Sequence, residues 1–567
     1  MKKLINNPRH LVREALESLV DTTPGLALLD GENVLLRRDD RPAAERPVAV
    51  LSGGGSGHEP GHAGYVGPGM LAAAVAGDVF TSPSVDAILA AIKAVAGPRG
   101  AVLIVKNYTG DRLNFGLAAE MATVEGIPTE IVMVADDVAL RDTVPPERRR
   151  GIAGTVFVHK VAGWAAAEGL PVGEVAALAR RAAERVGTMG VALGPCTVPA
   201  VGKPGFTLAD DEIELGLGIH GEKGVERLPL ESADALVERL LDSIILDKSL
   251  VAGEPVAILV NGLGATPPIE LAVVARHALA YARRRGLVVE RLYSGVYLSA
   301  LDMPGCSISV LRLDGELLAA LDAPTPVRAW SSDGRIADRR HVIAAPPTAV
   351  AGLESAPGPQ AAAIRAVLKA VAARLVAAEV ELADLDGRAG DGDLGASMVR
   401  GAEAIRALPP AVLHTPASAC LAVADALRRA IAGSSGPFYA VGLVRAGKVL
   451  EGKAEAGGED WCRAFAAAVA AVEQLGGARP GDRTMVDALR PAAGAWERAL
   501  AAGADPRAAF AAAVAAAGQG AQATRDMFPA LGRASYLGDR ARGIPDGGAR
   551  AVAIWLDAIA AAMAARP

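Results

Sequence analysis

Aromatic residues and cysteines are scarce in this chain of 567 residues. Aromatic side chains make up only 4% of it, although 51% is hydrophobic, and alanine supplies much of that apolar content. The four cysteines lie far apart and include no CxxC pair, which argues against a disulfide framework and against a structural zinc site. We therefore expect a protein of a reducing compartment, with closely packed helices in its alanine-rich C-terminal third.

Basic clusters and long apolar runs are also missing. The formal net charge is −6 and no run of lysine and arginine is longer than three residues, so nucleic acid and anionic membranes are not expected as partners. Residues 1–20 mix charged and apolar side chains, whereas a signal peptide needs an uninterrupted apolar core. No uncharged apolar run reaches the roughly 18 residues that span a bilayer. The sequence predicts a soluble, cytoplasmic protein.

Alternating strand and helix patterns predict a two-lobed α/β domain over residues 1–330. The pattern weakens over residues 186–225, and glycine and proline are dense in 194–224, so we take this stretch as the entry to the second lobe and assign lobes of about 1–185 and 186–330. Alanine-rich residues between the first two strands are expected to be helical. The expected strands are 47–52, 100–106 and 129–135 in the first lobe, and 255–260, 287–293 and a pair within 295–314 in the second.

Two glycine-containing loops follow predicted strands directly. They are 52-SGGGSGHEP-60 and 107-NYTGD-111. Ligands of α/β sheets bind at the carboxyl ends of strands, so both loops are expected to line one cleft. A third loop, 218-GIHGE-222, presents His220 between glycines. A lone histidine most often has a structural role, and the spacing of these loops does not identify a reaction.

A second domain follows a linker. Residues 331–358 are polar and then rich in proline, alanine and glycine, as interdomain linkers are. From 359 to 567 the apolar residues follow helical spacing and no strand pattern occurs, which predicts an all-α domain.

The acidic glycine loop 386-DGRAGDGD-393 is the most informative part of the second domain. Its three carboxylates, Asp386, Asp391 and Asp393, could converge on Mg²⁺, which prefers oxygen ligands. Ordinary turn chemistry explains the same residues equally well. Neither a P-loop nor a Rossmann glycine motif is present, so a bound nucleotide would need another kind of site, to which the amides of 433-GSSG-436 could contribute.

Taken together, these stretches resemble the dihydroxyacetone kinase family in its single-chain, ATP-dependent form. The resemblance covers nearly the whole chain and keeps the family's order of motifs. It implies phosphorylation of dihydroxyacetone (glycerone), a helical-barrel domain that binds ATP and Mg²⁺, and a homodimer. The motifs are GGGSGHEP, FTSPS, KNYTGD, FTLADDEIELGLGIHGE and NGLGATP, followed by GDGDLG, GSSGPFY, GDRTMVDAL and GRASYLGDRARGIPDGGA.

The resemblance also implies residue roles. His220 would bind the ketone carbon covalently as a hemiaminal, Asp111 would act as general base, and His58 would hydrogen-bond the substrate. Asp386, Asp391 and Asp393 would hold two Mg²⁺ ions. The substrate pocket would be lined by Gly54, Gly55, Ser82 and Lys106, and the nucleotide by Leu394, Gly395, Ala396, Ser397, Ser434, Ser435, Gly476, Met485, Arg533 and Asp546. Leu394 departs from the family, which often has a polar residue there.

Several alternatives stay open at this point. Similar kinases act on erythrulose, glyceraldehyde or other short ketoses and aldoses, and some animal relatives also cleave FAD to a cyclic FMN. In another form a separate protein rephosphorylates bound ADP, but its domains are normally separate chains, so the fusion here favours free ATP. Relatives of the first domain serve as coregulators, whereas the presence of His220 favours catalysis. Fatty-acid phosphorylation pairs the helical domain with a lipid-binding domain, which has no GIHGE loop.

Overall fold

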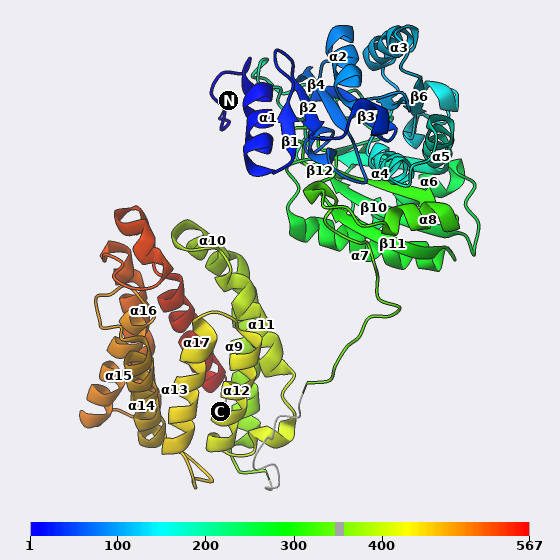
Figure 1. The fold of residues 1–567 in the computed structure, drawn as a ribbon. Coiled ribbons are helices and arrows are strands. Elements are labelled where there is room, and N and C mark those ends of the chain that lie inside the picture. Colours follow the sequence, from blue (N-terminus) through cyan, green and yellow to red (C-terminus); the bar gives the residue numbers. More distant parts are fainter. Residues whose placement is uncertain (1, 346–356, 566–567) are drawn as a thin grey trace. The chain divides into compact units, whose positions relative to one another are not determined.

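The computed structural model describes residues 2–345 and 357–565, apart from the side chain of Arg533. The chain forms two compact units, Met1–Val342 and Ile343–Pro567 (Figure 1). Residues 346–356 of the predicted linker lie outside the described residues.

Two six-stranded sheets form the first unit. The first sheet has the order β1-β2-β4-β3-β5-β6, and β4, β3, β5 and β6 run parallel. The second has the order β11-β10-β12-β7-β8-β9, in which β10 and β11 are the parallel pair. The strands are β1 (Leu26–Leu28), β2 (Val34–Arg37), β3 (Ala49–Ser56), β4 (Ala73–Val79), β5 (Ala101–Lys106), β6 (Thr129–Val134), β7 (Val186–Ala192), β8 (Glu212–Leu215), β9 (Glu226–Pro229), β10 (Pro255–Gly262), β11 (Val288–Gly295) and β12 (Gly305–Arg312).

Helices cover both outer faces of these sheets and fill the space between them. Helices α2 and α3 pack on one face of the first sheet, and α6 and α7 pack on the outer face of the second. Between the sheets lie α4 and α5. The helices are α1 (Leu11–Thr22), α2 (Val85–Val95), α3 (Thr109–Val124), α4 (Thr155–Ala167), α5 (Val172–Arg185), α6 (Ala233–Asp247), α7 (Pro268–Arg284) and α8 (Gly315–Asp322).

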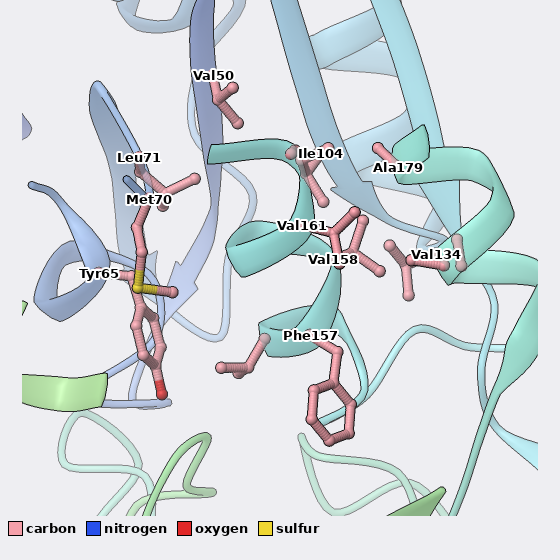
Figure 2. Close-up of a cluster of buried hydrophobic side chains, with 14 of the residues drawn as sticks. Val50, Tyr65, Met70, Leu71, Ile104, Val134, Phe157, Val158, Val161 and Ala179 are labelled. Carbon is pink, nitrogen blue, oxygen red and sulfur yellow. The ribbon is translucent and has the colours of Figure 1, made fainter. Parts of the chain in front are cut away.

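One hydrophobic core joins the two sheets. Residues of alternate parity point to opposite faces of a strand, so Val50 on β3 and Leu259 on β10 both reach the central layer. Figure 2 shows Phe157, Val158 and Val161 of α4 among side chains from the first sheet. The two predicted lobes therefore share a core, and neither sheet buries its inner face without the helices between them.

Most of the expected strands are confirmed, but two expectations were wrong. The alanine-rich segment after the first strand contains strand β4 where helix was expected. Alanine is the best helix former, but tertiary context routinely overrides propensity, and here β4 pairs with β2 and β3 on either side and buries Ala73 and Ala74. Within 295–314 a single strand, β12, forms in place of a pair. Residues 296–304 are instead a connection that carries Ser299 to the site described below.

The second unit is all-helical in its described residues, as expected. Its helices enclose an apolar cavity of about 520 Å³, whose lining includes Met398, Phe438 and Trp496. Helix α17 is long and apolar enough to cross a membrane by length and composition, but it packs within this unit against α9 and α16. The helices are α9 (Ala361–Ala377), α10 (Glu379–Ala389), α11 (Leu394–Arg406), α12 (Pro416–Ala430), α13 (Ser435–Val449), α14 (Gly458–Gly476), α15 (Val486–Ala501), α16 (Pro506–Ala523) and α17 (Gly547–Ala564).

Candidate active site

The carboxyl ends of β3 and β5 bring three of the expected substrate residues together. Gly54 adopts a φ of +148°, and a Cβ atom placed there would lie 3.6 Å from Nζ of Lys106 and 3.7 Å from Oδ1 of Asp111. Lys106 is the last residue of β5, and Asp111 lies in the first turn of α3. Because β3 and β5 are parallel neighbours, their ends meet at one edge of the sheet.

The end of β4 closes a further side of this pocket. A Cβ atom at Gly55 would come within 2.7 Å of the backbone of Phe80, so only glycine permits this approach. The hydroxyl of Ser82 would lie 2.6 Å from a Cβ atom at Gly110. Gly55 and Ser82, both expected at the pocket, thus lie where the β3 and β4 ends contact the start of α3.

His58 is fully buried and its protonation state follows from its partner. Its Nδ1 lies 2.9 Å from the carbonyl oxygen of Ser299, which can only accept a hydrogen bond, so Nδ1 carries the proton. Burial lowers the pKa of His58 well below its usual value, and the positive charge of Lys106 lowers it further. His58 is therefore neutral, with Nε2 as a hydrogen-bond acceptor.

His220 lies in the loop between β8 and β9, where its ring contacts three others. The ring centroids of His58, Phe80 and Tyr108 are 4.9, 5.0 and 4.7 Å away. Glu222 accepts a hydrogen bond from Nδ1 of His220 at 2.8 Å. Phe80, Tyr108 and Glu222 were not among the expected site residues. Each lies within a motif already quoted, and the carboxylate two residues after His220 was the signal that could have been used.

Buried polar atoms without partners gather around these residues. Within the described part of the chain, no hydrogen-bond partner is found for Nε2 of His58, Nζ of Lys106, the hydroxyl of Tyr108 or Oδ1 of Asp111. Such atoms are uncommon in folded proteins because each one costs desolvation energy. Burial also raises the pKa of Asp111, against the effects of Lys106 and of a hydrogen bond from Ser82. The pocket suits a small ligand with several oxygens.

Replacing Lys106 by methionine is expected to stabilise the fold and to lower the catalytic activity. Burial lowers the pKa of Lys106 from 10.5 to about 8, so holding it charged below pH 8 costs about 3 kcal/mol, a cost that disappears above pH 10.5. Lys106→Met should therefore raise the unfolding free energy of the first unit by up to this amount at pH 7. The gain should shrink between pH 8 and 10.5, as denaturant titrations would show. Turnover should fall because the ammonium is lost.

Lys160 provides a matched control for that experiment. It is a second buried lysine whose pKa burial lowers to about 8, and its Nζ donates to the carbonyl of Ala320, away from the pocket. Lys160→Met should leave turnover near the wild-type level. Full activity in Lys106→Met would show that the ammonium of Lys106 does not serve the substrate.

The acidic loop of the second unit brings its three carboxylates together. Oxygen atoms of Asp386, Asp391 and Asp393 all lie within 4.8 Å of one another. Asp386 belongs to α10, and its Oδ2 accepts from the amide of Leu394 at 3.2 Å. Gly392, with a φ of +81°, makes the turn that allows this convergence. Clustered carboxylates repel one another unless a cation lies between them, so the donor set fits Mg²⁺.

The other expected nucleotide residues lie mostly at helix ends. Leu394, Gly395, Ala396 and Ser397 form the first turn of α11, Ser435 begins α13, and Asp546 caps α17. Gly547 approaches Leu394, and Gly548 approaches Met485, so the α17 start lies beside the acidic loop. Gly476 packs against Phe438, and Phe438 lies about one helical turn after Ser434 and Ser435 on α13. The side chain of Arg533 lies outside the described residues.

An α/β unit with a polar pocket at its strand ends and a helical unit with a carboxylate cluster provide the parts that a two-domain phosphotransferase needs. Comparison with known proteins supports this class. Residues 17–329 match the Dak1 domain and residues 388–561 match the DAK2 domain. The chain therefore belongs to the dihydroxyacetone kinase family, in the form that carries both domains on one polypeptide.

Relatives match over nearly their full length. A putative 3,4-dihydroxy-2-butanone kinase of Solanum lycopersicum is 44% identical, covering 99% of this chain and 98% of the relative. The triokinase/FMN cyclase of Homo sapiens is 41% identical, covering 98% of both chains. The crystal structure of the dihydroxyacetone kinase from C. freundii with AMP-PNP and Mg²⁺ superposes with a TM-score of 0.64 at 34% identity, over 99% of each chain.

Proposed function

We propose that this protein transfers the γ-phosphate of ATP to a hydroxyl of dihydroxyacetone, giving dihydroxyacetone phosphate and ADP. The observation that carries the proposal is the group of unpartnered polar atoms beside His220, contributed by His58, Lys106, Tyr108 and Asp111. Dihydroxyacetone offers one carbonyl and two hydroxyls to these atoms. Burial of so small a molecule contributes little binding energy, so polar contacts and a covalent bond must hold it.

His220 is proposed to hold the substrate through its ketone. A lone pair on Nε2 would add to the carbonyl carbon, the electrons of the C=O bond would move to oxygen, and that oxygen would take a proton. The resulting hemiaminal fixes the orientation of both hydroxyls. Glycerol has no carbonyl and would be rejected on chemical grounds.

Asp111 is proposed to act as the general base. Its raised pKa favours accepting a proton from the substrate hydroxyl as that oxygen bonds to phosphorus. His58, neutral with Nε2 free to accept, would hydrogen-bond the same substrate. Lys106 would place a positive charge beside the transferred phosphate.

The helical unit is proposed to hold the donor. Asp386, Asp391 and Asp393 would bind Mg²⁺, which neutralises charge on the nucleotide phosphates. Amides at the first turn of α11 and at the start of α13 would contact the phosphates, as helix N-termini favour anions. Gly476, Met485, Arg533 and Asp546 would contact the remainder of the nucleotide. A homodimer and a cytoplasmic location stay predictions.

A second acceptor class stays open because the relatives differ in theirs. One is named for 3,4-dihydroxy-2-butanone and another for a triokinase that is also an FMN cyclase. A four-carbon ketose or a short aldose presents the same carbonyl to His220. Cyclase activity would be detected by incubating the protein with FAD.

Measuring ADP release across a substrate panel tests the proposal. The panel contains dihydroxyacetone, glyceraldehyde, both erythrulose enantiomers and glycerol, each with Mg-ATP. We expect turnover with carbonyl substrates, fastest with dihydroxyacetone, and none with glycerol. A higher kcat/KM for erythrulose would assign the alternative acceptor. Turnover of glycerol would contradict the carbonyl requirement. Absence of ADP release with every compound would contradict kinase activity.

A further inference from the structure

We infer that Glu222 is a positioning residue that holds His220 in the tautomer able to attack a carbonyl. Both oxygens of its carboxylate contact the same residue. Oε1 accepts from Nδ1 of His220 at 2.8 Å, and Oε2 accepts from the backbone amide of His220 at 2.9 Å. This double contact fixes the ring and its backbone as one rigid group.

The charge state of Glu222 determines which nitrogen of His220 carries the proton. Burial alone would raise the pKa of Glu222, but the hydrogen bonds that it accepts from the side chain and the backbone amide of His220 outweigh burial and bring the pKa down to about 2. An ionised carboxylate can only accept hydrogen bonds. Nδ1 of His220 must therefore be the donor, which leaves the lone pair on Nε2. An imidazole without such a partner favours the opposite tautomer, with the proton on Nε2.

The backbone around Glu222 leaves space for its carboxylate. A Cβ atom at Gly218 would lie 2.0 Å from Oε2 of Glu222 and 2.8 Å from Nη1 of Arg150. Gly218 does not have a φ in the left-handed region, so its backbone conformation does not require glycine. Glycine is found here because the Cβ atom of another residue would overlap the carboxylate of Glu222. Gly218 is thus required for the contact between carboxylate and imidazole.

Arg150 anchors this loop to the first sheet. Its Nε donates to Oδ2 of Asp137 at 2.7 Å, and its Nη2 donates to the carbonyl of Gly216 at 2.7 Å. Asp137 follows β6, whereas Gly216 belongs to the loop that carries His220. The loop that carries His220 is therefore bound to the first sheet through Arg150, and Glu222 contacts the His220 side chain directly.

This role rests on the proposed covalent step and deepens it. When Nε2 adds to the carbonyl carbon, the imidazole gains a positive charge and the carbonyl oxygen gains a negative one. Glu222 balances the first through Nδ1, while a proton from solvent neutralises the second. Without the carboxylate, His220 would present a protonated Nε2 for part of the time, and the reactive fraction would fall.

Nitrogen-15 NMR of labelled histidine in the free enzyme tests the inference without requiring activity. Signals of His220 are assigned by their loss in His220→Ala. The wild type should show a dominant Nδ1–H tautomer. In Glu222→Gln and in Gly218→Ala the Nδ1–H tautomer should no longer dominate. Gly218→Ala keeps the carboxylate of Glu222 but displaces it from His220. Glu226→Gln, on the neighbouring strand, makes the same charge change and should leave the spectrum unaltered.

Kinetics supply a second readout. In both loop variants the KM for dihydroxyacetone should rise about tenfold or more, while the KM for ATP stays near wild type. A wild-type Nε2–H tautomer would overturn the inference whether or not either variant folds. So would unchanged tautomers in both folded variants. An inactive wild type with the expected tautomer would instead count against the proposed kinase reaction alone.

Discussion

His220→Ala is expected to lower kcat/KM for dihydroxyacetone by at least about a thousandfold. The imidazole is the group proposed to bond the ketone, and orientation of a bound reactant can account for a large share of a catalysed rate. The protein should stay folded, because the His220 side chain lies in a loop and is one-fifth exposed. A coupled ADP-release assay, with circular dichroism and thermal melting alongside, measures both properties.

His341→Ala is the matched control for this variant. His341 is exposed and lies outside the helices and strands, so its removal should change neither activity nor melting. Mass spectrometry of the wild type with dihydroxyacetone should in addition detect an adduct that His220→Ala lacks. Undiminished turnover in the alanine variant would rule out the covalent role.

Asp391→Ala is expected to reduce turnover by about a hundredfold or more. The scale is that of losing one electrostatic contact to a reacting group. Calorimetry should show weakened binding of Mg-ATP, because a ligand of the cation is missing. Mg-ATP should also raise the melting temperature of the wild type and not that of the variant, since a ligand stabilises only the state that binds it.

Asp384→Asn controls for loss of a carboxylate near the acidic loop, because Asp384 lies on α10, the helix that leads into that loop. Asp384 lies 3.5 Å from Arg388 in an exposed ion pair and is not part of the carboxylate cluster. Such pairs contribute little, so Mg-ATP affinity should be preserved. Wild-type affinity in Asp391→Ala would mean that the acidic loop is a turn without a cation.

The sequence predicted the fold class because its patterns were local. The parallel strands β3, β5 and β6 each contain a short apolar run (AVL, AVLIV and IVMV), and the helical domain repeats apolar residues at helical spacing. Strand β4 was missed because the intrinsic preference of Ala73, Ala74 and Ala76 is for helix, and the tertiary context overrides it. Its place depends on β2 and β3 on either side, which is tertiary information.

The site was predictable only where a motif carried it. Glycine-rich loops identified the neighbourhoods of His58 and His220, and the acidic loop suggested a cation. Neither pattern showed that Glu222 would contact His220 with both oxygens, or that Ser299 would fix the tautomer of His58. The contact of Glu222 with His220 depends on the direction of a side chain. The contact of Ser299 with His58 joins residues more than two hundred positions apart in the sequence.

The core shared by the two sheets also bears on how the first unit opens in solution. Amide hydrogens in β3 and β10 are covered by the same central layer, so neither sheet can unfold while the other keeps its full protection. Exchange of their most protected amides should require one common opening event. Binding of a ligand at the β3 end would then slow hydrogen exchange in the second sheet as well, at positions that never touch the ligand.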